Sequence, residues 1–289
     1  MSEDQINKIQ DLLRQIGPSL VACSGGLDSL VLAVLEHRLF PAHALIAHGV
    51  SPAVPREANA RVRECAAKEG WRVEWVESGE LQNEAYLQNP LNRCFHCKTH
   101  LYGVLREFGY DPKTGRYGRA GDSAFRRSIE TFKPYPILSG ANTDDLGEYR
   151  PGLDAAREAG VRHPWIEAGI GKEGIRAVCR LLELPFSELP ASPCLASRIY
   201  TGTRVERQWL SLIDSVESEL KERTGVRVVR CRLKEKSLWI ETTKEEQQKL
   251  TMGVVEEIRE RILAANPELE SLALDPAPYQ PGRAFVKSL

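Results

Sequence analysis

The chain has 289 residues, of which 42% are hydrophobic and 27% are charged, and its formal net charge is -1 at pH 7. This length and composition are typical of a globular protein with one large or two ordinary domains. The balanced charge excludes a global field that would draw the chain to nucleic acid or to an anionic membrane, and no apolar stretch is long enough to span a bilayer.

The first part of the chain alternates helix and strand patterns. Apolar residues at helical spacing predict a helix that ends at Gly17, and the apolar run 19–23 predicts a buried strand. Further expected elements are a helix over about 28–37, a strand over 43–50, a helix over 56–69, and strands over 71–77 and 136–140. This alternation predicts an α/β fold with a mainly parallel sheet and helices on both faces.

The pattern changes after about residue 203. The expected elements there are a helix over 208–223, strands over 226–233 and 237–242, a helix over 245–264 and an irregular tail over 275–283. They predict a small α+β domain, so we expect domains at 1–203 and 204–289.

Residues 109–135 lack periodicity and carry six Lys or Arg against three Asp or Glu. We expect a solvated surface loop. The alternative is a basic flap over an anionic ligand.

Residues 24–29, Ser-Gly-Gly-Leu-Asp-Ser, follow the first strand directly and are called the glycine loop below. Two glycines let the backbone approach an anion, and the N-terminus of the next helix points N–H groups at it. The common P-loop and dinucleotide fingerprints are absent. The expected pyrophosphate cradle is made of four residues: Ser24, Gly25, Gly26 and Ser29.

Three further residues are candidates for the same site. Asp28 is expected to orient the glycine loop or to help hold Mg²⁺. Asp145 follows the strand over 136–140, and it is either a ligand of the metal or nucleotide or a helix N-cap. Lys172 either reaches a phosphate or is a solvated lysine near a helix start.

Three cysteines form a second pattern. Cys94 and Cys97 make a Cys-x-x-Cys, and Cys194 lies far downstream in a Pro-bounded loop. A lone Cys-x-x-Cys is half a zinc site or a redox pair, whereas three thiolates suit a [4Fe–4S] cluster with one open iron. Three cations flank these thiols: Arg93, Lys98 and Arg198. The remaining cysteines are expected to pack in or near the core: Cys23, Cys65, Cys179 and Cys231.

The glycine loop resembles the PP-loop of the ATP pyrophosphatase superfamily, and the chain as a whole resembles the LarE family of sulfur transferases. The matching stretches are SGGLDS (24–29), RCFHCK (93–98), SGANTDDLGEYRPG (139–152), HPWIEAGIGKEGIR (163–176), PCLASRI (193–199) and RCR (230–232). The resemblance implies an AMP-forming, ATP-dependent sulfurtransferase that acts on pyridinium-3,5-biscarboxylic acid mononucleotide. Its carboxylates become thiocarboxylates in the nickel-pincer cofactor.

Two sulfur sources are implied by the family. In one branch the cysteine at the position of Cys194 gives up its own sulfur and becomes dehydroalanine. In the other branch three cysteines, here Cys94, Cys97 and Cys194, hold a [4Fe–4S] cluster that delivers sulfide. This chain has all three, so we expect the cluster type. Ser197 and Arg198 are expected to position the acyl-adenylate.

Arg230 and Arg232 are two residues apart in an expected strand, so they share one face. Paired guanidinium groups suit the substrate phosphate, and the family match supports this role. Glu241 is expected either to orient the substrate or to be an exposed strand carboxylate.

The polar, acidic N-terminus is unlike a signal peptide, so we expect a cytoplasmic protein with reduced thiols. We expect a small-molecule substrate, a homo-oligomer by resemblance, and neither a membrane nor a nucleic-acid partner. The nearest alternative function is a PP-loop tRNA thiolase with a three-cysteine cluster, and a zinc-holding nucleotide sensor is a non-catalytic one. The stretch 109–135 is longer than the family pattern, which puts the family's oligomer contacts in doubt.

Overall fold

The computed structural model describes residues 2–147 and 149–286, so Glu148 of the 139–152 motif lies outside it. The chain forms two compact units, which we treat separately. The first comprises Met1–Ser51, Arg56–Glu80 and Cys94–Ser192, and the second comprises Pro52–Pro55, Leu81–Arg93 and Pro193–Leu289. The second unit thus takes in residues on both sides of position 203, and the expected functional domains at 1–203 and 204–289 stay a prediction.

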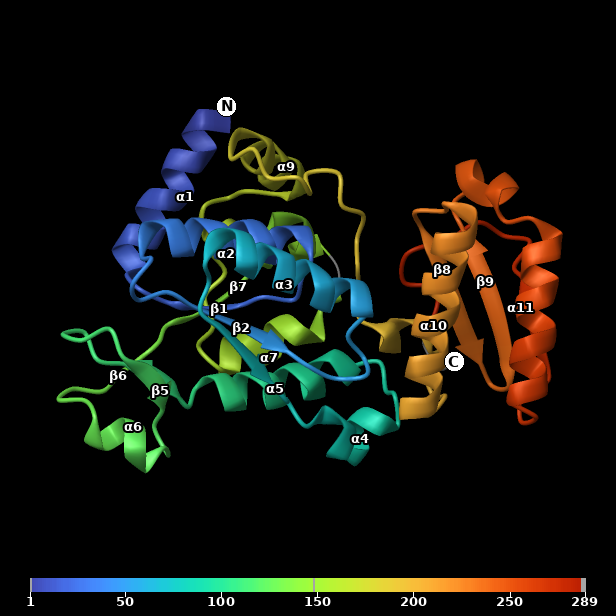
Figure 1. Ribbon diagram of the computed structural model, residues 1–289, viewed down its shortest axis with the longest axis horizontal. Helices are drawn as coiled ribbons and strands as arrows, with labels where there is room; N and C mark the ends of the chain where they lie inside the picture. The colour runs from blue at the N-terminus through green and yellow to red at the C-terminus, as the bar shows by residue number, and fades with distance from the viewer. Residues whose placement is uncertain (1, 148, 287–289) are drawn as a thin grey trace. The chain divides into compact units, whose positions relative to one another are not determined.

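The first unit contains the predicted parallel sheet (Figure 1). Its strands are β1 (Leu20–Ala22), β2 (Leu45–Gly49), β3 (Val73–Val76) and β7 (Ile137–Ser139). They lie in the order β3-β2-β1-β7, and all neighbours are parallel. The fold class expected from the sequence is therefore confirmed.

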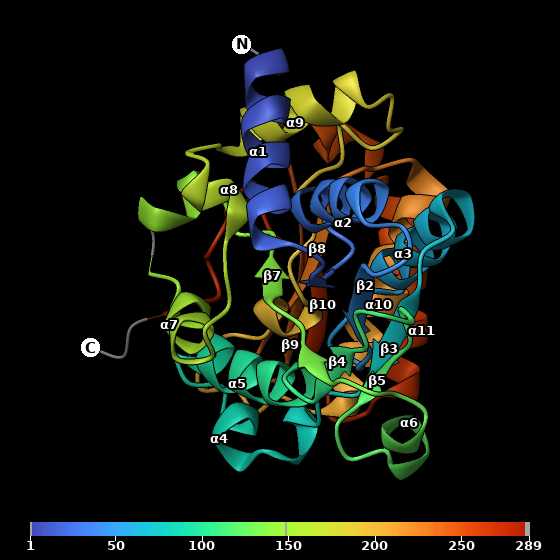
Figure 2. The same cartoon turned by 90° about the vertical axis from the view of Figure 1, so that its left-hand side faces the viewer.

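Helices cover both faces of this sheet, with α1, α2 and α9 on one side and α5 and α7 on the other (Figure 2). The longer helices are α1 (Ser2–Ile16), α2 (Leu27–Leu39), α3 (Arg56–Glu69), α5 (Arg93–Leu105), α7 (Pro151–Glu158) and α9 (Lys172–Leu181). The short ones are α8 (Pro164–Glu167) and the 3₁₀ helices η1 (Glu80–Gln82) and η2 (Thr143–Gly147). Among the helices of the described residues, none has the length and apolar character needed to cross a membrane.

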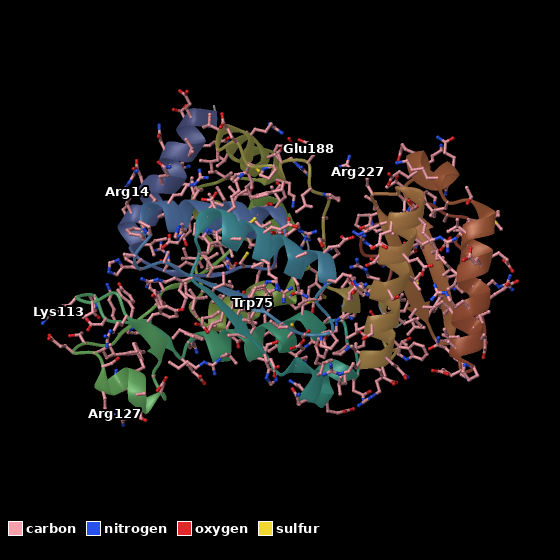
Figure 3. The ribbon with its side chains drawn as sticks, in the orientation of Figure 1. Arg14, Trp75, Lys113, Arg127, Glu188 and Arg227 are labelled. Carbon is pink, nitrogen blue, oxygen red and sulfur yellow. The ribbon has the colours of Figure 1, made fainter. Side chains whose placement is uncertain are left out.

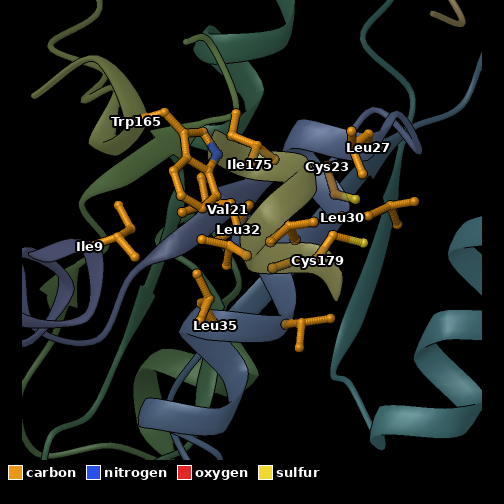
Figure 4. Close-up of a cluster of buried hydrophobic side chains, with 14 of the residues drawn as sticks. Ile9, Val21, Cys23, Leu27, Leu30, Leu32, Leu35, Trp165, Ile175 and Cys179 are labelled. Carbon is orange, nitrogen blue, oxygen red and sulfur yellow. The ribbon is translucent and has the colours of Figure 1, made fainter. Parts of the chain in front are cut away.

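The strands alternate between two cores because successive side chains point to opposite faces. Val21 and Ile46 face a cluster with Ile9, Leu30 and Trp165, shown in Figure 4. Leu20 and Leu45 face a second cluster that α5 and α7 help to close, with Tyr102, Leu105 and Ala156. Cys23 and Cys179 lie in the first cluster, Cys65 packs against it and Cys231 is buried in the second unit, so the expected packing role of these four cysteines is confirmed.

The expectation of a surface loop over 109–135 is wrong. The segment folds as β4 (Phe108–Tyr110), β5 (Tyr117–Arg119), α6 (Ser123–Arg127) and β6 (Lys133–Pro134), with an antiparallel sheet in the order β5-β4-β6. Glycines at 109 and 118 make room for two phenylalanine rings, since a Cβ at either position would overlap them. Lys113 and Arg127 lie at its outer end (Figure 3). Strands of two or three residues are too short for periodicity to reveal them.

The second unit has a three-stranded sheet in the order β10-β9-β8. Its elements are α4 (Glu84–Leu87), the 3₁₀ helix η3 (Leu195–Arg198), α10 (Arg207–Thr224), β8 (Val229–Lys234), β9 (Ser237–Thr242), the 3₁₀ helix η4 (Lys244–Lys249), α11 (Met252–Ala265) and β10 (Ser271–Leu274). The single helix expected over 245–264 is thus wrong, because Thr251 at the N-cap of α11 has an extended backbone that separates η4 from α11. Strand β10, parallel to β9, was not predicted.

Candidate active site

The glycine loop leaves β1 and enters α2 through a tight turn that requires glycine. Gly25 has a φ of +75°, and a Cβ at this position would lie 2.7 Å from the carbonyl oxygen of Ala58 in α3. Only glycine fits both the backbone conformation and the space. The hydroxyl of Ser29 closes the loop, because it donates to the Gly26 carbonyl at 3.1 Å and accepts from the Ser24 N–H at 3.1 Å.

The start of α2 is suited to an anion. Its N-cap residue, Gly26, has no side chain to cap the helix, so no capping hydrogen bond forms there. The N-terminal N–H groups of this 13-residue helix carry the positive end of its dipole. Loop and helix together form the kind of backbone cradle that binds phosphate groups.

Asp28, in the first turn of α2, has one carboxylate oxygen that is hydrogen-bonded and one that, in the part of the chain that the structure describes, is not. Its Oδ2 accepts hydrogen bonds from Nζ of Lys172 at 3.0 Å and from Nδ2 of Asn142 at 3.2 Å. Its Oδ1 is buried without a hydrogen-bond partner among the described residues. Burial raises the pKa of Asp28 above its ordinary value even though Lys172 opposes the shift. A buried carboxylate oxygen of this kind fits a hard cation such as Mg²⁺.

Two neighbouring acids in η2 have different tasks. Asp145 accepts from the Asn142 N–H at 3.0 Å and forms an ion pair with Arg150 at 3.0 Å. Asp144 accepts from the Lys172 N–H at 2.9 Å and so caps α9. Whether Asp145 serves the metal or nucleotide stays a prediction. The negative charge of Asp145 helps to raise the pKa of Asp28, so Asp145 lies near the Asp28 carboxylate.

The sequence analysis missed Arg61 in this region. Arg61 of α3 donates from Nε to the Gly25 carbonyl at 2.8 Å and from Nη2 to the Ser192 hydroxyl at 3.1 Å. Asn142 joins Asp28 to η2, because its Oδ1 also accepts from the Asp144 N–H at 2.9 Å. Asn142 stands in the expected strand-end stretch and was a possible candidate. Arg61 sits in a polar helix that carries no motif.

The cysteines of the second pattern lie on two units. Cys94 and Cys97 are half-buried on successive turns of α5 in the first unit. Cys194 is exposed at the N-cap of η3 in the second unit. Within residues 2–147 and 149–286, no three or more His, Cys, Asp or Glu side chains are gathered in a metal-binding group. The donor chemistry of three thiols suits an iron–sulfur cluster, and the cluster itself stays a prediction.

Arg198 organises the loop that carries Cys194. Its Nε and Nη2 hold the two carboxylate oxygens of Glu217 at 2.9 Å each. Its Nη1 donates to the carbonyls of Pro193 at 2.7 Å and Cys194 at 3.1 Å, and to the Ser197 hydroxyl at 3.1 Å. Burial alone would raise the pKa of Glu217, but Arg198 and a backbone N–H hold it below its ordinary value. The Arg198 side chain is 2% exposed, and its expected role in positioning the acyl-adenylate stays a prediction.

Arg230 and Arg232 share one face of β8, and that face is covered. Nε of Arg232 pairs with Oε2 of Glu241 at 2.6 Å, and Oε1 of Glu241 pairs with Arg283 at 2.8 Å. Glu241 is 1% exposed, so the reading of it as an exposed strand carboxylate is wrong. Burial lowers the pKa of Arg230 below its ordinary value, and repulsion from the Arg198 cation lowers it further.

The cover is residues 275–286, called the C-terminal segment below, which contains no helix or strand and agrees with the expected irregular tail. Its Tyr279 ring centre lies 5.3 Å from the guanidinium carbon of Arg230 and 5.7 Å from that of Arg232. The Gln280 carbonyl accepts from Arg232 at 3.0 Å. A cation at this distance from an aromatic ring is attracted to the ring electrostatically.

Comparison with known proteins adds the following. No family model matches the chain. An uncharacterised protein of Synechocystis sp., slr1717, is 30% identical over 254 residues, which is 88% of this chain and 87% of the relative. An uncharacterised protein of Methanocaldococcus jannaschii, MJ0830, is 23% identical over 202 residues, or 70% of this chain and 69% of the relative.

A third relative has a named activity. The pyridinium-3,5-bisthiocarboxylic acid mononucleotide synthase of Lactiplantibacillus plantarum is 29% identical over 133 residues, 46% of each chain. This partial similarity supports the resemblance to the LarE family. By the extent and identity of its match to the Synechocystis protein, the chain belongs to the same protein family as slr1717.

Proposed function

We propose that the chain is an ATP-dependent sulfur transferase that converts a carboxylate of pyridinium-3,5-biscarboxylic acid mononucleotide to a thiocarboxylate. The observation that carries this proposal is the similarity to the Lactiplantibacillus plantarum synthase. The anion cradle of the glycine loop supports it, because such a reaction needs a site for the phosphates of ATP.

The first step activates the substrate. A carboxylate oxygen attacks the α-phosphorus of ATP, the bond to the β-phosphate breaks, and pyrophosphate leaves with its electron pair. The glycine loop holds the pyrophosphate, and Lys172 offsets charge on the phosphates from the start of α9. Asp28, which has a buried carboxylate oxygen without a hydrogen-bond partner among the described residues, would help hold Mg²⁺, and the ion would supply charge stabilisation at the phosphates. The product is an acyl-adenylate, whose AMP is a far better leaving group than an oxide.

The second step delivers sulfur. A sulfur nucleophile attacks the acyl carbon and AMP leaves. If the nucleophile is the Cys194 thiolate, loss of its Cα proton then expels the thiocarboxylate and leaves dehydroalanine. If Cys94, Cys97 and Cys194 hold a [4Fe–4S] cluster, the group supplies a replaceable sulfide and the protein turns over. Cys194 is exposed, so a substrate can reach its sulfur.

The second unit binds the substrate phosphate in this proposal. Arg230 and Arg232 supply guanidinium groups for it, Glu241 fixes Arg232, and Ser197 lies beside Cys194. Because the C-terminal segment covers these arginines, it forms part of the substrate site. A cytoplasmic location and a homo-oligomer remain predictions.

The test starts from anaerobic reconstitution of the chain with iron and sulfide, followed by reaction with ATP, Mg²⁺ and the dicarboxylate mononucleotide. We expect AMP, pyrophosphate and thiocarboxylate in equal amounts. An unchanged protein mass favours the cluster, and loss of the mass of hydrogen sulfide from Cys194 favours the sacrificial route. Absence of both AMP and thiocarboxylate refutes the function.

Single variants separate the two sulfur sources. Cys94→Ala and Cys97→Ala abolish turnover only if the cluster operates, whereas Cys194→Ala abolishes it in both cases. The matched control is Cys65→Ala, a half-buried helical cysteine outside the site, which is expected to keep full activity.

A further inference from the structure

Arg61 joins two segments that the proposed reaction uses at different steps. One guanidinium donates to the Gly25 carbonyl of the glycine loop at 2.8 Å and to the Ser192 hydroxyl at 3.1 Å. Ser192 stands two residues before Cys194 in the sequence. The same side chain therefore contacts the expected ATP loop and the chain that leads into the sulfur-donor loop.

These two hydrogen bonds are made by a largely buried side chain. The Arg61 side chain is 18% exposed, and its nearest acid, Glu57, is 3.9 Å away, too far for a tight pair. Burial lowers the pKa of Arg61, so the cation gives up hydration to reach its two acceptors. Arg63, two residues later in α3, is exposed and instead lies over the ring of Trp75 at 4.7 Å.

The backbone around Arg61 is fitted to the same two segments. One turn before Arg61 in α3, Ala58 packs so closely on Gly25 that no Cβ fits there. Just before α3, the Ala53 carbonyl accepts from the N–H of Leu195, the residue after Cys194, at 2.7 Å. Within the first unit, α3 thus contacts the turn of the glycine loop and Ser192, and within the second unit Ala53 holds the residue after Cys194.

We propose that Arg61 is a positioning residue that couples occupancy of the glycine loop to the conformation of the Cys194 loop. Phosphate in the loop fixes the Gly25 peptide, the peptide fixes Arg61, and Arg61 orders the approach to Cys194. The coupling rests on the proposed function, in which an adenylate formed before the sulfur is in place is lost to water. An arginine suits this task because its rigid fork serves two acceptors at once.

The test is amide hydrogen exchange of the full chain with and without saturating MgATP, with nucleotide binding measured separately by titration. In the wild type we expect ATP to slow exchange of the amides in residues 194–199 by about fivefold or more. Ser192→Ala removes only the second contact of Arg61, so it is expected to bind ATP normally and to lose this slowing. Arg61→Lys, which cannot fork, is expected to lose it too. Arg63→Ala is the matched control and keeps it.

A second measurement addresses chemistry. With the dicarboxylate mononucleotide, the ratio of AMP to thiocarboxylate is expected to rise about threefold or more in Ser192→Ala, at an unchanged KM for ATP. The coupling is overturned if ATP slows amide exchange in Ser192→Ala as much as in the wild type. It is also overturned if ATP binds to the wild type without slowing exchange there. If ATP binds and slows exchange but no carboxylate yields AMP, the proposed function fails and the coupling stands. Absence of ATP binding overturns both.

Discussion

Glu36 makes the stability of the first unit depend on pH in the range where most proteins are insensitive to it. It lies in the last turn of α2 with no exposed surface, its Oε1 accepts from the Ser19 N–H at 2.8 Å, and its Oε2 has no partner among the described residues. Burial raises the pKa of this carboxyl to about 8, against an ordinary value of 4.5, and the Ser19 hydrogen bond only moderates the shift.

The sign follows from proton binding. Between these two values the folded state holds a proton that the unfolded state releases, so the stabilisation is complete below pH 4.5 and is lost as pH rises through about 8. From pH 5 to pH 8 the Glu36 contribution falls by roughly 3 to 4 kcal/mol, using about 1.4 kcal/mol per pH unit. Glu36→Gln keeps an oxygen that can accept from Ser19 and removes the titration.

The assay is urea denaturation across pH 5 to 8, followed by tryptophan fluorescence in a variant that keeps only Trp165, which is buried in the same core. The free energy of unfolding of the wild type is expected to decline with pH more steeply than that of Glu36→Gln, by the amount given above. Glu173→Gln, at an 85% exposed side chain, is the control and keeps the wild-type slope. A difference in slope worth less than about 1 kcal/mol over this range would show that Glu36 ionises normally and would refute the reasoning.

Three further predictions concern the sites. Arg198→Met leaves the carboxylate of Glu217 buried without its bidentate partner, so it is expected to destabilise the second unit by about 3–5 kcal/mol. Adding Glu217→Leu is expected to recover most of this loss. Chemical denaturation of the single and double variants measures both effects. Gly25→Ala forces a Cβ to within 2.7 Å of a backbone oxygen at a positive φ, so we expect a cost of about 1–3 kcal/mol in thermal unfolding and a loss of ATP binding in titration. Lys172→Met removes the cation 3.0 Å from Asp28 and is expected to lower pyrophosphate release about 100-fold, with partial recovery in Lys172→Arg; equal activity of wild type and Lys172→Met would contradict a role at the phosphates.

The elements that the sequence predicted well are those specified by local patterns. The parallel strands read as short buried runs, and the glycine loop stands out because its glycines are needed for backbone reasons that hold in any context. The same reasoning failed at Thr251, where one extended residue divides an apparently continuous helix.

Contacts between distant segments were beyond the reach of sequence patterns. An exposed strand carboxylate stayed an alternative for Glu241, because alternation alone cannot reveal that residues 275–286 return to cover that face. Arg61 and Arg198 are ordinary arginines in sequence, and their tasks depend on partners 36, 131 and 19 residues away. Such roles are tertiary, so they become visible only once the chain is folded.

The discontinuous make-up of the second unit bears on how this gene can be cut or recombined. A fragment that starts at residue 204 would carry Glu217 without Arg198, its 2.9 Å partner. It would also lack Leu87, whose carbonyl accepts from the N–H of Val205 at 2.8 Å. Chimeras between relatives should therefore exchange residues 193–289 together with 52–55 and 81–93, because these three stretches fold as one compact unit.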